Sequence, residues 1–472
     1  MLIKPSLEHR CNRRQALRNV ACGFGHTALM GMLAAESTAQ SDSKQSTGLH
    51  HSGKAKCVIF LFMHGGVSHV DTFDPKPELD RLHGQPSPIK KPDFNFAETG
   101  TIFRSPWKFK NYGESGIPVS DLFPHIGSCV DDIAIVRSMN GDQVAHGGAS
   151  LLLHTGDGVM IRPSLGAWTL YGLGSVNQNL PGFITLSPST YHGGSQNYGA
   201  AFLPAVYQGT SFGDGNTAPR RAQINNLIPS ESITSLQRMQ LDFLKKHNLR
   251  HLAIRNEDAR LQAQIESFEL SFRMQMAAPE VFDLASETRE CQTLYGLDHA
   301  VTEDFGYQCI IARRLAESGV RFIQINHSHP RNYWDAHGGL ESNHGGLAPK
   351  VDKPIAALLT DLKRRGLLDE TLVIWATEFG RTPAAQGSDG RDHHPHAFSI
   401  WMAGGGIRGG TVYGATDELG YYVTENKVLM KDFHATVLHL LGIDHQRLTY
   451  RYSGRDFRLT DVEGQVVHSI LS

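Results

Sequence analysis

The sequence has almost no excess of charge and few cysteines. Its 45 basic and 47 acidic residues leave a formal net charge of −2, without a block of like charge or an acidic tail. This balance argues against nucleic-acid binding, for which a basic excess is typical. The six cysteines are widely spaced and include no CxxC pair, which excludes a disulfide-rich scaffold and a zinc site of that pattern. Glycine and histidine are plentiful instead, with 48 and 25 residues, and so many glycines favour turns and loops over a helical bundle.

Residues 1–39 have the layout of an export signal, with a basic start, a weakly apolar stretch and a small-residue end. Arg13 and Arg14 resemble the pair of a twin-arginine signal, although Asn12 and Ala16 differ from its usual residues. The apolar stretch is short and rich in glycine, so no stable membrane span is expected after signal removal. We therefore expect an exported protein, periplasmic or extracytoplasmic, that uses the twin-arginine pathway. Because this pathway carries folded proteins, a cofactor could be bound before export.

Five nearly continuous apolar runs predict strands that are buried on both faces of a parallel sheet. They lie at residues 56–63, 132–139, 321–326, 371–377 and 397–404. Apolar residues at helical spacing lie between them, as in 307–319 and in 351–366, which ends at Gly366, a good helix C-cap. The repeated order of helix, glycine and strand predicts an α/β fold with a mostly parallel central sheet and helices on both faces.

Composition also suggests how the chain is divided. Residues 40–55 are rich in Ser, Gly, Lys and His and are predicted to be a linker, followed by one domain over residues 56–472. Residues 230–304 are charged and helix-prone with few strand signals, which predicts a helical insertion or cap on the sheet. Residues 404–410 are rich in glycine but lack the Lys and Ser/Thr of a phosphate-binding loop, so we expect a turn before a strand.

Imidazole and carboxylate groups stand beside four of the predicted strands. In open parallel sheets ligands collect at the carboxyl ends of strands, and these groups are the ones that Zn²⁺ or Mn²⁺ takes as ligands. The predicted metal ligands are His64, Asp71, Asp335, His337, Glu378 and His393. Each also has a plainer interpretation, as a strand-end cap, a turn carboxylate or a surface pair. The coincidence of all of them at strand ends favours a metal site.

Several long motifs resemble one large bacterial family. They lie at residues 62–79 ("FMHGGVSHVDTFDPKPEL"), 334–339 ("WDAHGG"), 367–383 ("LLDETLVIWATEFGRTP"), 390–418 ("GRDHHPHAFSIWMAGGGIRGGTVYGATDE") and 432–444 ("DFHATVLHLLGID"). The chain is identified from them as a member of the family called domain of unknown function 1501, often labelled sulfatase-like. That family is grouped by fold with the alkaline-phosphatase-like superfamily of phosphatases, sulfatases and phosphomutases.

The superfamily resemblance implies a two-metal site at the strand ends. Asp335, His337 and His393 match the ligands of one ion best, although only one residue separates the first two. His64 and Glu378 occupy two positions of the other ion's site. The residue after Glu378 is Phe379, which cannot ligate, so that second site is altered.

The nucleophile position is altered as well. The superfamily places Ser, Thr or Cys at a helix start ten residues before a Gly, and in "HGGASLLLHTG" that position is His146, counted back from Gly156. No Cys-x-Pro-x-Arg segment is present, so the formylglycine of true sulfatases cannot be made there. His146 could attack phosphorus, ligate a metal, position water or bind an anion.

We therefore expect an exported hydrolase of phosphate or sulfate esters that depends on one or two divalent ions, zinc or manganese. Its substrate would be a small-molecule or glycan ester. His146 or a water molecule would be the nucleophile, and Arg381 or Arg391 would hold the non-bridging oxygens as a planar donor fork. The alternative is a metal-containing binding protein for an extracytoplasmic glycan or anionic polymer that has lost catalysis.

Overall fold

The computed structural model describes residues 48–89, 100–222, 234–254, 269–270, 273–274, 278–328 and 334–472. The predicted export signal and the first part of the predicted linker lie outside these residues. In the described part of the chain, no helix is both long and apolar enough to cross a membrane.

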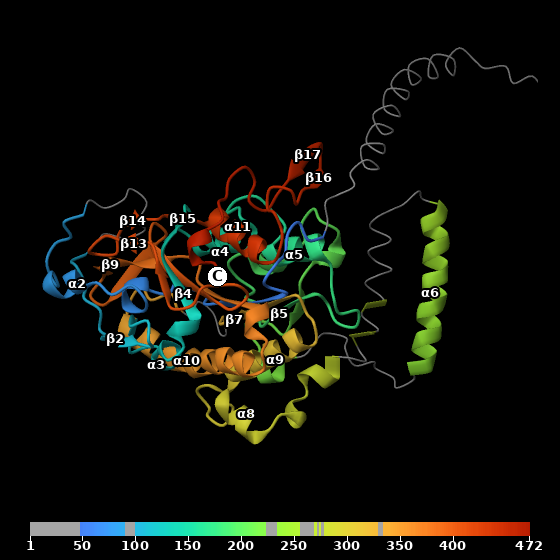
Figure 1. The fold of residues 1–472 in the computed structure, drawn as a ribbon, viewed down its shortest axis with the longest axis horizontal. Coiled ribbons are helices and arrows are strands. Elements are labelled where there is room, and N and C mark those ends of the chain that lie inside the picture. Colours follow the sequence, from blue (N-terminus) through green and yellow to red (C-terminus); the bar gives the residue numbers. More distant parts are fainter. Residues whose placement is uncertain are drawn as a thin grey trace, which may run out of the picture. The chain divides into compact units, whose positions relative to one another are not determined.

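A central sheet of nine strands organises the domain (Figure 1). Its strands are β1 (Cys57–Phe62), β4 (Ile133–Asn140), β5 (Phe183–Leu186), β6 (Thr210–Phe212), β7 (Phe322–Asn326), β8 (Thr371–Ala376), β11 (Phe398–Ala403), β12 (Thr411–Tyr413) and β15 (Val428–Leu429). Eight of them follow the order β12-β4-β11-β8-β1-β7-β5-β6, and β15 pairs with β4. All neighbours except those of β11 are parallel. The predicted α/β class with a mostly parallel sheet is confirmed.

The predicted strands are buried because helices cover both faces of the sheet (Figure 1). The described residues contain the helices α2 (Pro77–Arg81), α3 (Pro124–Gly127), α4 (His146–Thr155), α5 (Leu165–Leu173), α6 (Thr234–Ile254), α8 (Arg289–Leu294), α9 (Glu303–Glu317), α10 (Leu340–Arg364) and α11 (Met430–Leu440), of which α4, α5, α9, α10 and α11 pack on the sheet. In β1, Ile59 and Leu61 pack into a core cluster with α9 and α10. Val58 and Phe60 pack into a second cluster with α4, α5 and α11. Alternate side chains of one strand thus fill two cores, which explains the continuous apolar run.

One strand differs from its expected direction. The run at 397–404 was predicted as part of a parallel sheet, but β11 is antiparallel to both β4 and β8. The chain leaves β8 through the hairpin of β9 (Gly380–Gln386) and β10 (Gly390–His394). A parallel return needs a crossover connection, usually a helix, and a hairpin does not provide one. The chain therefore re-enters the sheet in the opposite direction.

The helix ends agree with the sequence signals. The helix predicted at 351–366 is the C-terminal part of α10, which begins earlier, at Leu340, and tolerates two internal prolines. Gly366 follows α10 with φ +70, the left-handed conformation expected of a glycine that ends a helix. The described parts of residues 230–304 contain α6 and α8, and the predicted turn at 404–410 precedes β12.

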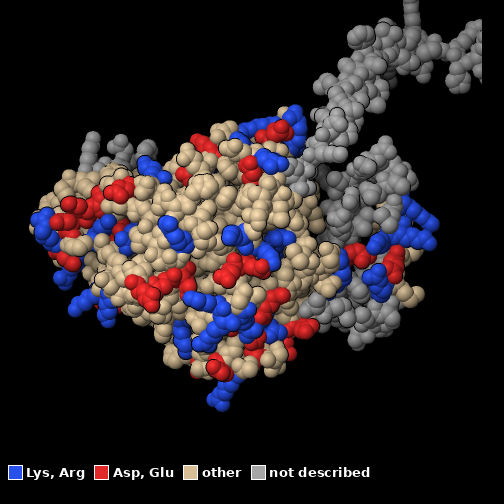
Figure 2. Space-filling view, viewed as in Figure 1, with Lys and Arg blue, Asp and Glu red and all other residues tan. Residues whose placement is uncertain are grey.

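Three smaller antiparallel pairs complete the described chain: β2 (Phe109–Tyr112) with β3 (Ile117–Ser120), β13 (Ala415–Thr416) with β14 (Val423–Glu425), and β16 (Tyr450–Tyr452) with β17 (Arg455–Phe457). On the face drawn in Figure 2, basic and acidic side chains of the described residues are interspersed rather than separated.

Candidate metal centre

Four side chains from three separate parts of the chain meet at one point. They are His146, Asp335, His337 and His393, and their possible ligand atoms all lie within 4.8 Å of one another. His146 is the first residue of α4, at the helix start that the superfamily resemblance implied. Asp335 and His337 lie in the connection between β7 and α10, and His393 belongs to β10. In the part of the chain that the structure describes, imidazole and carboxylate groups gather in one such cluster.

The three imidazoles converge on a single oxygen. The Nε2 atoms of His146, His337 and His393 lie 3.2, 2.9 and 3.3 Å from Oδ1 of Asp335. The Nε2 atom of His146 is buried and, although Oδ1 of Asp335 lies near it, has no well-aligned hydrogen-bond partner. A buried imidazole nitrogen without a partner is costly unless something else satisfies it. A cation bound among these four groups would satisfy it.

Each imidazole is oriented by an acceptor at its outer nitrogen. Nδ1 of His146 lies 2.6 Å from Oε1 of Glu378. Nδ1 of His393 lies 2.8 Å from the carbonyl oxygen of Val144, and Nδ1 of His337 lies 2.5 Å from the side-chain oxygen of Gln386. Since all three partners accept, each Nδ1 donates a proton outward, and each Nε2 faces inward, where it can bind a cation once it is unprotonated.

This arrangement fits a metal site. Histidine ligands almost always donate their other N–H to a carboxylate, a carbonyl or water, which fixes the tautomer and the ring orientation. The donor set of three imidazoles and one carboxylate suits Zn²⁺, Mn²⁺ or Fe²⁺. The residues present therefore fit the predicted divalent ion.

The electrostatics of the centre favour a cation. Burial would raise the pKa of Asp335, but the surrounding histidines and Arg381 hold that pKa well below its usual range. Burial would likewise raise the pKa of Glu378, but its contact with His146 lowers that pKa to about 2. Both carboxylates are thus ionised at neutral pH, and Arg381 is the guanidinium beside Asp335. When the imidazoles are neutral, two carboxylates against one guanidinium leave a net negative charge at the centre, which attracts a metal ion.

Glu378 lies outside the ligand cluster, although it was predicted as a ligand. Its Oε1 accepts from Nδ1 of His146 and from the backbone N–H of Gly65 at 2.9 Å, and Thr377 donates to its Oε2 at 3.2 Å. These bonds turn the carboxylate toward the outer nitrogen of His146. Its position is that of a group that orients a ligand.

His64, another predicted ligand, is buried beside the cluster and pairs with a histidine that the prediction missed. Nε2 of His64 lies 2.9 Å from Nδ1 of His192. The ring of His192 stacks on that of His146, with 4.9 Å between centroids. Neither His64 nor His192 belongs to the group of four.

A sequence signal for His192 did exist. The tripeptide His-Gly-Gly occurs five times, starting at His64, His146, His192, His337 and His344. The glycines allow the backbone to approach the site closely. Gly65 has φ +117, and a side chain there would lie 2.6 Å from the backbone nitrogen of Trp334, the residue before Asp335.

Asp71 and Arg391 pair with each other, away from the cluster. Both side chains are fully buried, and Oδ2 of Asp71 lies 2.7 Å from Nε of Arg391. Arg391 also donates to the carbonyl oxygens of Thr382, Pro383 and Phe103. The prediction gave Asp71 to a metal and Arg391 to a substrate. In the structure a buried carboxylate needs a cationic partner, and each of the two satisfies the other.

Arg381 is also fully buried, and it holds the centre together. Its guanidinium donates to Oδ1 of Asp335 at 2.5 Å and to the carbonyl oxygens of Gly65, Gly66 and Arg391. All of its nitrogens therefore have protein partners. It fixes Asp335 and does not present a donor fork to substrate oxygens.

The centre has an apolar wall and an open side. The ring of Phe379 lies 4.8 Å from that of His146 and 4.6 Å from that of His393. His337 is the most accessible member, with 38% of its side chain exposed against 14% for Asp335. A ligand from solvent would reach the centre past His337.

Comparison with solved structures gives likenesses of low identity over most of the chain. A sulfatase from Pseudoalteromonas sp. is 13% identical, with 88% of this chain and 71% of that chain covered and a TM-score of 0.35. A phosphonate monoester hydrolase from Silicibacter pomeroyi is 12% identical, with 74% and 71% covered and a TM-score of 0.37. An alkaline phosphatase from the Antarctic bacterium TAB5 is 10% identical, with 75% and 92% covered and a TM-score of 0.34. These likenesses assign neither a reaction nor a substrate to this chain.

Comparison of the sequence with curated proteins gives no match. One family model, described as "Protein of unknown function (DUF1501)", matches residues 55–471. That range includes the whole central sheet and all four residues of the candidate metal centre. The resemblance expected from the long motifs is thereby confirmed, and the chain belongs to the DUF1501 family.

Proposed function

We propose that the protein is a metal-dependent hydrolase of phosphate or sulfate esters. The observation that carries the proposal is that three imidazoles, each held by an acceptor at its outer nitrogen, converge on Asp335. A divalent ion held by His146, Asp335, His337 and His393 would polarise a phosphoryl or sulfuryl oxygen of the ester.

The number of protein donors bears on which ion it is. Catalytic zinc sites usually have three protein ligands and leave the fourth position for water or substrate. Four donors from the protein would close a tetrahedral zinc site. We therefore favour an ion that accepts five or six ligands, such as Mn²⁺, because it leaves room for a substrate oxygen.

The residues around the ion site have three further roles: they bind the ion, position its ligands and contact the substrate. With Nε2 directed at the ion site and Nδ1 held by Glu378, His146 acts as a ligand, and the attacking group is water. Arg381 fixes Asp335, and Gln386 fixes His337. His192 is half-buried at the edge of the centre and stacked on His146, so we assign it to contact with the substrate.

The proposal is tested by metal content and turnover. Protein purified without a His-tag is analysed by elemental mass spectrometry and assayed on aryl phosphates and aryl sulfates with Mn²⁺ or Zn²⁺ added. We expect one bound ion and turnover with Mn²⁺, both lost in Asp335→Asn and His337→Ala. Metal-loaded wild-type protein that hydrolyses neither ester class would refute a hydrolase of these substrates.

A second measurement separates the two roles considered for His146. If it were the nucleophile, protein quenched during turnover of a phosphate ester would carry a phosphoryl group, detectable by mass spectrometry. As a metal ligand it would carry none, and His146→Gln would lower the metal affinity.

The second candidate is a metal-containing binding protein for an extracytoplasmic glycan or anionic polymer. It is favoured by the complete burial of Arg381 and Arg391, which leaves neither guanidinium available to a transferring group. One bound ion without turnover of any ester, together with retained glycan binding, would select this candidate.

Export by the twin-arginine pathway completes the proposal and is supported by Arg13 and Arg14. A reporter fused behind residues 1–39 is expected to be exported from the cytoplasm. The same reporter is expected to remain in the cytoplasm when Arg13 and Arg14 are both replaced by lysine. Export of the lysine variant would point to another route.

A further inference from the structure

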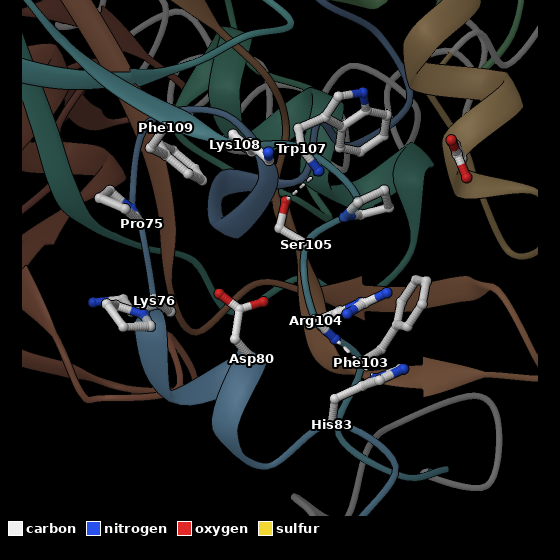
Figure 3. A pocket seen from close by; sticks show the side chains of 13 residues that line it. Pro75, Lys76, Asp80, His83, Phe103, Arg104, Ser105, Trp107, Lys108 and Phe109 are labelled. Carbon is white, nitrogen blue, oxygen red and sulfur yellow. Dashed lines mark hydrogen bonds between the residues drawn. The ribbon is translucent and has the colours of Figure 1, made fainter.

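A groove of about 820 Å³ lies beside α2 and the segment that leads into β2 (Figure 3). It is lined by Pro75, Lys76, Pro77, Asp80, His83, Phe103, Arg104, Ser105, Pro106, Trp107, Lys108, Phe109 and Glu341. Figure 3 shows Lys76 and Phe109 on one wall, Arg104 and Phe103 on the other, and the carboxylate of Asp80 between them. The metal centre contributes none of these residues.

The lining combines three kinds of group. Phe103, Trp107 and Phe109 are half-buried aromatic rings. Arg104 and Lys108 are exposed, and no ion pair of theirs exists among the described residues. Lys76 differs, because it pairs with Asp74 at 3.1 Å. The third kind is carboxylate, from Asp80 and Glu341, both exposed.

The groove adjoins the loop that carries two of the metal ligands. Glu341 lies in the first turn of α10, four residues after His337. Trp107 stacks on His344 at 6.2 Å between centroids, and His344 meets the ring of Trp334 at 5.0 Å. Trp334 directly precedes Asp335. A molecule held in the groove would therefore contact Trp107, which packs through His344 and Trp334 against the loop that carries Asp335.

The carboxylates decide between classes of anionic ligand. A polymer with phosphate or acid groups alone would be attracted by Arg104 and Lys108 but repelled by Asp80 and Glu341. A glycan that bears acidic substituents offers both partners at once. Its hydroxyl groups donate to carboxylates, its sulfate or phosphate groups accept from guanidinium and ammonium, and its apolar ring faces pack on aromatic side chains.

We propose that this groove binds an acidic glycan, a sugar chain carrying sulfate or phosphate esters. The statement that this glycan is the substrate rests on the proposed hydrolase function. The binding itself requires no metal and no turnover.

The test measures binding by the full mature chain of Asp335→Asn, which separates the groove from catalysis. The probes are a sulfated dextran oligosaccharide, the unsulfated oligosaccharide of the same length and poly-glutamate, each followed by calorimetry. We expect the sulfated probe to bind at least about tenfold more tightly than either of the others.

Two variants locate the binding. Arg104→Gln with Lys108→Gln is expected to weaken binding of the sulfated probe roughly tenfold and to reduce its salt dependence. Trp107→Ala should weaken it by a similar factor. Lys110→Gln is the matched control, because Lys110 is exposed, lies two residues from Lys108 and does not line the groove. Trp107 packs against the core, so Trp107→Ala could lose binding through loss of folding. Arg104 and Lys108 are exposed, so the double variant should fold normally and its loss of binding can be assigned to the groove.

The outcomes distinguish the two proposals. Equal binding of poly-glutamate, unchanged binding by the double variant, or an equal loss in Lys110→Gln would overturn the glycan site. Tight, groove-dependent binding without ester hydrolysis by wild-type protein would support the site and remove the hydrolase function. Hydrolysis of small esters without glycan binding would support the hydrolase function and overturn the glycan site.

Discussion

Replacing Glu378 by Gln is expected to weaken metal binding without removing a metal ligand. The Glu378 side chain is fully buried, and its Oε1 lies 2.6 Å from Nδ1 of His146. Gln has the same shape, so its amide oxygen can still accept from the N–H of Gly65. The change removes the negative charge that fixes the His146 tautomer and makes its Nε2 a stronger donor to the ion.

The expected size follows from the position of this contact. Loss of an outer-shell partner typically lowers metal affinity 10- to 100-fold, which is about 1.4 to 2.7 kcal/mol. The contact here is short, charged and shielded from water, and Glu378 supplies one of two negative charges at the centre. We therefore expect the upper part of that range.

The dissociation constant for Mn²⁺ is measured by competition with a fluorescent chelator for wild type, Glu378→Gln and Asp335→Asn. Glu317→Gln serves as the control, because Glu317 pairs with Arg313 away from the centre. Asp335→Asn should lose binding almost completely. If Glu378→Gln binds within about threefold of wild type while Asp335→Asn does not bind, the outer-shell argument is wrong.

Three further outcomes follow from the structure. Asp71→Asn should lower the free energy of unfolding in urea by about 3 to 5 kcal/mol, because it leaves Arg391 buried without its carboxylate; loss of metal with unchanged stability would instead restore Asp71 as a ligand. Gly390→Ala should displace His337 and weaken metal binding, since its Cβ would lie 1.9 Å from the His337 carbonyl oxygen, whereas Gly346→Ala has space and should bind normally. The fold should lose stability as pH falls from about 6.5 towards 4, because buried histidines must be protonated on unfolding, each costing up to about 3 kcal/mol at pH 4. The groups concerned are His154, whose pKa burial lowers to about 4, and His327 and His344, whose pKa burial lowers to about 3. Each accepts a hydrogen bond from an N–H group, so its neutral form is required. An unfolding midpoint that is flat from pH 7 to 4.5 would contradict this.

Local patterns in the sequence predicted much of the fold. The buried strands gave continuous apolar runs because both faces of β1, β7 and β8 are covered by helices or by other core residues. The end of α10 before Gly366 was also predictable from neighbouring residues. The position of His146 at a helix start was implied by the superfamily resemblance. The direction of β11 was not, because a strand has the same apolar pattern in either direction. It depends on the hairpin that precedes it.

The sequence by itself determined which chemical groups stand near strand ends, and it placed Asp335, His337 and His393 among them. Only the tertiary structure decided which of these groups meet. His146 is 232 residues from Glu378, Asp71 is 320 residues from Arg391, and His64 is 128 residues from His192.

The physical reason is that the chemical type of a side chain is a property of one residue, whereas its role depends on the groups that the fold places beside it. A buried carboxylate takes the nearest cation or N–H group that the fold supplies. For Asp71 that partner is Arg391, for Glu378 it is His146, and for Asp335 it is Arg381 together with the three imidazoles that converge on it.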